Sequence, residues 1–124
     1  MSGRPEIVCV IDDDTAVRNA LKFLLEVEGM TVRTYDGPIS LLADRNLPPC
    51  ACIIVDHDMP VMNGLEMLTV LRSRGAMAPA ILITGHGNTC LQKLASPLGV
   101  RRILEKPLLH HTLVESIRAA LAPH

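Results

Sequence analysis

The sequence predicts an α/β fold in which a parallel sheet lies between two layers of helices. Five short apolar runs alternate with five segments of helical periodicity, and the connections between them are short. Right-handed crossovers place the helices on both faces of such a sheet, so the alternation implies a three-layer, doubly wound arrangement. The length of 124 residues favours a single domain.

Five apolar runs are interpreted as strands. The runs at 7–11, 51–56 and 80–84 are nearly continuous in apolar residues, which is typical of strands buried on both faces. The segments 31–35 and 100–105 also carry polar or charged residues. We therefore expect these two strands near the edges of the sheet.

Helical periodicity is clearest in the segments 15–28 and 108–121. Shorter helices are expected at 39–44, 65–72 and 88–95, the last of which should stop at a Ser-Pro dipeptide. The side chains expected to face the core are Val17, Ala20, Leu21, Leu24 and Leu25 in the first helix, Leu65, Leu68 and either Leu71 or Arg72 in the third, and Leu109, Leu113, Ile117, Ala120 and Leu121 in the last.

The composition limits the function classes open to the chain. The formal net charge is −1, which argues against a broad electrostatic surface for nucleic acid. No apolar run reaches the roughly 18 residues of a membrane span, and the N-terminus lacks the pattern of a secretory signal. We expect a cytoplasmic protein that contacts neither nucleic acid nor a membrane directly. Phe23 and Tyr35 are the only aromatic residues, so the core must be aliphatic.

The chain has four cysteines, Cys9, Cys50, Cys52 and Cys90. Cys9 and Cys52 lie in strand-like apolar runs and are interpreted as small buried hydrophobic residues. The spacing of Cys50 and Cys52 is not that of a zinc site, and no second Cys/His pair is suitably placed. We expect reduced thiols, as is usual in the cytoplasm.

Polar residues stand at the ends of four predicted strands: Asp12 and Asp13, Asp56, Thr84 and Lys106. Parallel strands end at one edge of a sheet, and open α/β sheets bind ligands at that edge. Each residue alone has an ordinary explanation, since acids favour helix N-termini and a strand-end threonine or a solvated lysine is common. It is the combination of these residues that predicts a functional site.

The chemistry of such a cluster follows from its charges. Two carboxylates about 4 Å apart repel by roughly 4 kcal/mol at an effective dielectric of about 20, so several together need a cation or shifted pKa values. Oxygen ligands at an open face suit Mg²⁺. A carboxylate beside that ion can attack phosphorus to give an aspartyl phosphate. The hydroxyl and the ammonium group would then hold the phosphate oxygens.

Four motifs of the sequence resemble the receiver domain of two-component response regulators. They are Val10-Ile11-Asp12-Asp13-Asp14, Val55-Asp56-His57-Asp58-Met59-Pro60, Ile83-Thr84-Gly85-His86-Gly87 and Glu105-Lys106-Pro107. The third motif is most similar to the nitrogen-fixation-regulator subgroup. The resemblance implies a flavodoxin-like receiver fold with strand order 2-1-3-4-5. It also implies one receiver domain, 1–124, without an output domain, either standing alone or cut from a longer protein.

The resemblance also implies roles for the site residues. Asp56 would accept a phosphoryl group from a sensor histidine kinase in a Mg²⁺-dependent reaction. The residues that match the family's metal ligands are Asp12, Asp13, Asp56 and the backbone carbonyl of Asp58. Thr84 matches the switch hydroxyl, Lys106 matches the phosphate-pairing lysine, and the Lys106-Pro107 peptide is expected to be cis. The implied function is a phosphorylation-dependent signalling switch rather than a metabolic enzyme.

Two positions depart from the family pattern. Ile103 stands where an aromatic switch residue is usual, so the aromatic swing cannot occur as such. Pro97 stands where the fourth helix would continue, so that helix should be short or loose. The face formed by 88–121 is expected to bind a downstream target or a phosphotransfer protein. The chain is expected to be a monomer or a weak homodimer.

Two further residues, Asp58 and His86, occupy positions that tune loss of the phosphate in this family. We hypothesise that they contact each other over the site and restrict attacking water; the alternative is that both are solvated loop residues. Two other functions are considered. A haloacid-dehalogenase-like phosphatase would use Asp56 as nucleophile and Asp58 as general acid, but its motif belongs on a first strand. A pseudo-receiver would only bind a partner, but the acidic set is complete.

Overall fold

The structure is a computed structural model that describes residues 6–47 and 49–122. Its strands are β1 (Ile7–Ile11), β2 (Thr31–Tyr35), β3 (Cys52–Asp56), β4 (Ala80–Thr84) and β5 (Val100–Glu105). Its helices are α1 (Thr15–Val27), α2 (Pro38–Ala43), α3 (Gly64–Ser73), α4 (Thr89–Ala95) and α5 (His110–Leu121), with one 3₁₀ turn, η1 (Ser96–Leu98). Every predicted element forms, and its ends lie close to the predicted ones.

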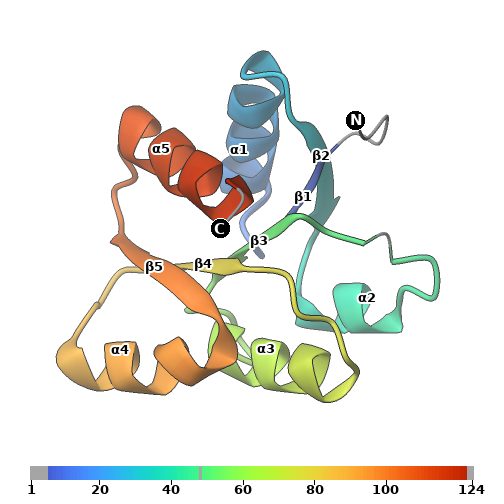
Figure 1. The fold of residues 1–124 in the computed structure, drawn as a ribbon, viewed down its shortest axis with the longest axis vertical. Helices are drawn as coiled ribbons and strands as arrows, with labels where there is room; N and C mark the ends of the chain where they lie inside the picture. Colours follow the sequence, from blue (N-terminus) through green and yellow to red (C-terminus); the bar gives the residue numbers. More distant parts are fainter. Residues whose placement is uncertain (1–5, 48, 123–124) are drawn as a thin grey trace.

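The five strands are parallel and lie in the order β2-β1-β3-β4-β5, which confirms the order implied by the resemblance. Figure 1 shows α1 and α5 on one face of the sheet and α2, α3 and α4 on the other. The predicted three-layer arrangement is therefore confirmed. Within the described part of the chain, no helix combines the length and the apolar character needed to cross a membrane.

The pattern of burial explains the strand order. Every residue of β3 and β4 is buried, as expected for continuous apolar runs in the centre of a sheet. Strands β2 and β5 each contain several exposed residues and only one buried residue, and they form the two edges, as predicted. In β5 the register shifts between the pairs Ala80–Val100 and Ile81–Arg102. The edge strand thus carries a β-bulge, which weakens its fit to another strand.

Each face of the sheet carries its own aliphatic core. One core contains side chains of α1 and α5, and the other contains side chains of α3 and α4. The prediction that Ala20 and Leu109 face the core is wrong, because Ala20 is exposed and Leu109 is 61% exposed. The last helix begins at His110, later than predicted, so Leu109 is its N-cap residue and points away from the core.

An arginine of α3 joins this helix to η1, the turn that follows α4. Leu71 is buried, whereas Arg72 is half-buried and turns its guanidinium group toward backbone carbonyls. Its Nε donates to the carbonyl of Leu98 at 2.8 Å, and its Nη1 donates to the carbonyl of Ala76 at 2.8 Å. Helix α4 has seven residues and passes into η1 at Pro97, which confirms that it is short.

The prediction of reduced thiols is wrong for one cysteine pair. Cys9 and Cys50 form a disulfide, with their Cα atoms 6.2 Å apart. The prediction failed because the two residues are 41 positions apart, and only the fold shows that the segment before β3 runs beside β1. Cys52 is a free buried residue as predicted, and burial raises the pKa of its thiol to about 12. Cys90 is free and exposed.

Candidate functional site

Three carboxylates meet at the carboxyl edge of the sheet. Asp12 follows β1 and Asp56 ends β3, and the two side chains are only 1% and 3% exposed. Asp13 is exposed beside them. One oxygen from each of the three carboxylates lies within 4.8 Å of the others. The meeting of these acids, predicted from the strand ends, is therefore present in the structure.

Backbone groups hold the two buried carboxylates in place. The Asp14 amide donates to Oδ1 of Asp12 at 2.9 Å, and the Asp58 amide donates to Oδ1 of Asp56 at 3.0 Å. Burial raises the pKa of Asp12, and the nearby charge of Asp56 adds to this effect. Arg18 was not among the predicted site residues, and its Nη1 donates to the backbone carbonyl of Asp12 at 2.8 Å. The sequence places Arg18 near the start of the helix that follows the acids, and this position could have indicated a contact with them.

Lys106 partly balances this negative charge. Its Nζ lies 3.3 Å from Oδ2 of Asp56, and its side chain is 37% exposed. Partial burial by itself would lower the pKa of Lys106, but the charges of Asp56 and Asp12 outweigh it and the pKa is raised. The Lys106-Pro107 peptide is cis, as the resemblance implied.

Thr84 is 1% exposed and its hydroxyl is engaged by Asp58. The Thr84 Oγ1 lies 3.2 and 3.3 Å from the two Asp58 oxygens, and the Gly85 amide donates to Asp58 Oδ2 at 2.8 Å. Partial burial would raise the pKa of Asp58, but the Gly85 amide and the Thr84 hydroxyl outweigh it and the pKa is lowered. Asp58 is therefore held as a carboxylate that links the end of β3 to the end of β4.

No hydrogen bond or ion pair joins the side chains of Asp58 and His86 among the described residues. His86 is exposed, and its backbone amide donates to Thr84 Oγ1 at 3.1 Å. The two residues are thus connected through the Thr84 hydroxyl rather than directly. The hypothesis that these two residues restrict attacking water stays a prediction, because a two-residue offset gives the loop in which a side chain lies but not its direction.

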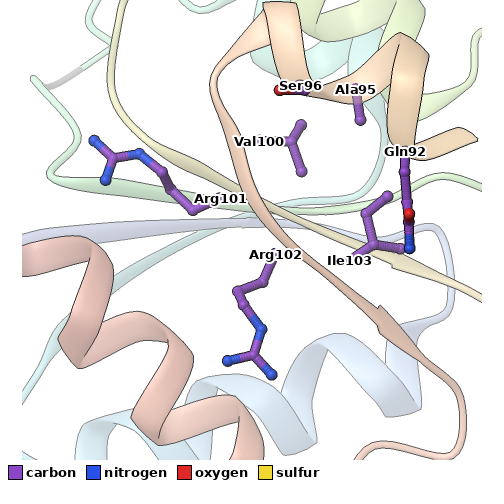
Figure 2. A pocket seen from close by; sticks show the side chains of 7 residues that line it. All are labelled: Gln92, Ala95, Ser96, Val100, Arg101, Arg102 and Ile103. Carbon is purple, nitrogen blue, oxygen red and sulfur yellow. The ribbon is translucent and has the colours of Figure 1, made fainter.

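Ile103 lies away from the acids, in the gap between β5 and α4. It is half-buried and lines a hollow of about 360 Å³ together with Gln92 and Ala95 of α4. Figure 2 shows Ile103 next to Gln92, whereas Arg102 points to the other side of the strand. The position that usually carries an aromatic residue therefore faces unfilled space.

The residues at the carboxyl edge fit a magnesium ion. All donors are carboxylate oxygens at an open edge, which is the ligand set that Mg²⁺ prefers. Burial is the main reason that the pKa of Asp12 is raised, and repulsion from the carboxylates of Asp56 and Asp13 raises it further. A divalent cation would relieve this repulsion.

The fold and this arrangement of acids, hydroxyl and lysine define a receiver-type signalling domain rather than a conventional enzyme. The chain belongs to the response regulator receiver domain family of two-component systems, whose family model matches residues 8–118. That match covers both edges of the sheet and every residue of the candidate site.

Relatives with known roles agree with this assignment. The chain is 42% identical over 115 residues to the transcriptional regulatory protein FixJ of Azorhizobium caulinodans, covering 92% of this chain and 54% of that protein. It is 36% identical over 121 residues to the response regulator protein TodT of Pseudomonas putida, covering 98% of this chain and 53% of that protein. The chain thus spans about half the length of the curated relatives that it matches.

Solved structures show the same fold. A CheY-like receiver domain protein from Methanospirillum hungatei superposes with a TM-score of 0.86 at 25% identity, covering 95% of this chain and 94% of that chain. The structure named FixJ-N superposes with a TM-score of 0.83 at 28% identity, covering 95% of this chain and 94% of that chain.

Proposed function

We propose that Asp56 accepts a phosphoryl group from the phosphohistidine of a sensor histidine kinase and that this modification switches the domain. The observation that carries the proposal is the surroundings of Asp56. Its carboxylate is 3% exposed, lies beside two other carboxylates and is bonded to Lys106. An acid in this setting is positioned by fixed donors and can attack an electrophile that brings its own negative charge.

The proposed step transfers one phosphoryl group. A carboxylate oxygen of Asp56 forms a bond to phosphorus as the phosphorus–nitrogen bond of the phosphohistidine breaks, and the electron pair returns to the imidazole nitrogen. Lys106, which is held in its charged form, attracts the phosphoryl oxygens. The Asp58 amide, which donates to Asp56 Oδ1, fixes the orientation of the attacking carboxylate.

We propose that Asp12, Asp13, Asp56 and the backbone carbonyl of Asp58 hold Mg²⁺ for this reaction. When bound, the ion supplies positive charge to the phosphoryl oxygens. The three carboxylates supply oxygen ligands within 4.8 Å of one another. Arg18, through its bond to the Asp12 carbonyl, keeps the backbone of the first acid in place.

The switch itself is proposed to involve Thr84. Its hydroxyl is bonded to Asp58 in this structure, and a phosphate on Asp56 offers stronger acceptor oxygens. Movement of the hydroxyl to the phosphate would release Asp58 and shift the loop after β4, which carries Gly85 and His86. The 88–121 face next to this loop is the proposed surface for a downstream target or a phosphotransfer protein.

The remaining parts of the proposal concern the setting of the protein. We propose that it acts in the cytoplasm, as a monomer or weak homodimer, with a histidine kinase as its phosphodonor. The described residues contain no membrane-crossing helix, and the net charge of −1 does not favour direct binding to nucleic acid. The 88–121 face would then act through protein contacts.

The lowered pKa of Asp58 argues against the phosphatase alternative. A general acid must carry a proton when it acts, whereas the Gly85 amide and the Thr84 hydroxyl lower the pKa of Asp58. The pseudo-receiver alternative predicts a broken site, but the acids and Lys106 are in contact.

The test is incubation of the protein with acetyl phosphate and MgCl₂, followed by intact-mass measurement. The expected product is a single phosphoryl adduct that hydroxylamine removes and that is absent from Asp56→Asn. A matched control is Glu115→Gln, which removes an exposed acid of α5 and should leave the adduct unchanged. An adduct that persists in Asp56→Asn, or steady turnover of phosphate esters, would contradict the proposal.

A further inference from the structure

We propose that Cys50 is a thiol–disulfide exchange site for low-molecular-weight thiols of the glutathione class, through which the Cys9–Cys50 bond is formed and broken. The site lies at the amino end of the sheet and is independent of the acids at the opposite edge. It rests on three observations: the pairing of the two cysteines, the difference in their accessibility and the placement of the other two cysteines.

The fold keeps the two cysteines adjacent whether or not they are bonded. Cys9 lies in β1, and Cys50 lies two residues before β3. The Ala51 amide donates to the Ile7 carbonyl at 2.8 Å, and Val8 pairs with Cys52 in the parallel register. These backbone contacts hold the Cα atoms at 6.2 Å, within the range that a disulfide spans. A reduced pair would remain close enough for the bond to form again.

The two cysteine residues differ in burial. Cys9 is fully buried in the core that faces α2 and α3. Cys50 is only partly buried and lines an apolar groove of about 410 Å³. Leu47 and Met77 also line this groove, and Met77 is 72% exposed. A small thiol can therefore reach the sulfur of Cys50 through the groove but cannot reach that of Cys9.

Reduction proceeds in two balanced steps. The thiolate of a small thiol attacks Sγ of Cys50, the bond to Cys9 breaks, and its electron pair and a proton from solvent leave Cys9 as a thiol. A second thiol then attacks the added sulfur of the mixed disulfide, which releases the Cys50 thiol and a small-molecule disulfide. Oxidation is the reverse, with the small-molecule disulfide as oxidant. An apolar environment disfavours a thiolate, so a buried leaving group makes the first step slow.

The other two cysteines cannot replace Cys9 as the partner. Cys52 is buried in the opposite core, which faces α1 and α5, and its raised pKa keeps it protonated. Cys90 is exposed at the start of α4, on a different helix from those that border the groove. The exchange therefore involves one accessible sulfur and one buried partner.

A matched pair of variants tests the difference in accessibility. Cys9→Ser and Cys50→Ser are each reduced and then incubated with glutathione disulfide, and adducts are located by peptide mass spectrometry. We expect a glutathione adduct on Cys50 in Cys9→Ser and none on Cys9 in Cys50→Ser. Cys90 should react in both variants and shows that the reagent works, while unreacted Cys52 shows that the core is intact. Equal modification of Cys9 and Cys50, or no adduct on Cys50, would overturn the proposal.

The unmodified chain supplies a second test that does not depend on a variant that folds. The protein is equilibrated in glutathione buffers of increasing oxidised fraction, quenched with acid and alkylated after unfolding. Cys9 and Cys50 should lose alkylation together in one two-electron transition, with Cys52 remaining alkylated at every ratio. Alkylation of Cys9 at all ratios, including pure glutathione disulfide, or a bond that contains Cys90, would show that the site does not exist.

Discussion

The two edge strands of the sheet each place one large side chain on the same face, but they hold it differently. Tyr35, at the end of β2, is 8% exposed, and its hydroxyl donates to Oδ2 of Asp44 at 2.6 Å. Ile103, in β5, is half-buried and borders a hollow of about 360 Å³. The side chain at the β2 edge is fixed by packing and a charge-assisted hydrogen bond, whereas the side chain at the β5 edge borders unfilled space.

The two edges are also connected to Asp56 and its neighbours in different ways. Toward β2, the Asp12 amide donates to the Tyr35 carbonyl at 3.3 Å, so the connection is part of the backbone ladder. Toward β5, the backbone ladder continues, since the His57 amide donates to the Ile83 carbonyl at 2.8 Å and the Lys106 amide donates to the Thr84 carbonyl at 2.9 Å. This side has side-chain bonds in addition, in which the Thr84 hydroxyl and the Gly85 amide donate to the Asp58 carboxylate. A phosphate can replace side-chain bonds without breaking a sheet. We therefore expect a conformational response at the β5 edge and little change at the β2 edge.

The largest expected effect is a difference in stability between two truncations. Tyr35→Ala removes a buried aromatic ring and should lower the free energy of unfolding by about 3–4 kcal/mol. Ile103→Ala removes a half-buried side chain beside an existing hollow and should lower it by about 1 kcal/mol. Urea denaturation of both variants measures the two values. Equal losses would show that the β5 edge is packed as tightly as the β2 edge.

The next effect isolates the hydrogen bond at the β2 edge. The pKa of Tyr35 is raised to about 12, and the largest cause is burial, with the hydrogen bond to Asp44 as the second. Because this pKa lies above the ordinary value of 10.0, the stabilisation is complete below pH 10 and is lost as the pH rises toward 12. Tyr35→Phe should cost about 1 kcal/mol at neutral pH. Its stability should approach that of the unmodified protein between pH 10 and 12, and a constant difference would contradict the assignment.

The features that the sequence could predict are those that depend on local residues or on strand direction. The central strands were found because continuous apolar runs depend only on local residues. The meeting of Asp12 with Asp56 followed from strand direction alone. The direction of a side chain in a loop and the pairing of distant cysteines depend on tertiary distances. For that reason the Thr84–Asp58 bond and the Cys9–Cys50 disulfide could not be deduced before the fold was known.

A smaller effect concerns the side-chain bonds that lead to the β5 edge. If Asp58 restricts the approach of water to a phosphorylated Asp56, Asp58→Ala should shorten the lifetime of the acyl phosphate several-fold, which corresponds to about 1 kcal/mol. His86→Ala should change it less, because the described contact of His86 uses its backbone amide. Loss of phosphate is followed by intact mass after removal of the phosphodonor. Unchanged lifetimes in both variants would end the hypothesis that these residues control water.

The smallest expected effect is that of filling the hollow beside Ile103. Ile103→Phe adds volume where Gln92 and Ala95 leave about 360 Å³ of space, so the free energy of unfolding should change by less than about 1 kcal/mol. Leu82 is the matched control, because it is the register partner of Ile103 in β4 and is 0% exposed. Leu82→Phe should cost about 1–3 kcal/mol, since a close-packed core has no space for the ring. If both substitutions cost the same, the hollow is not available to a larger side chain, and the proposed freedom of the β5 edge would have to come from the loop after β4 alone.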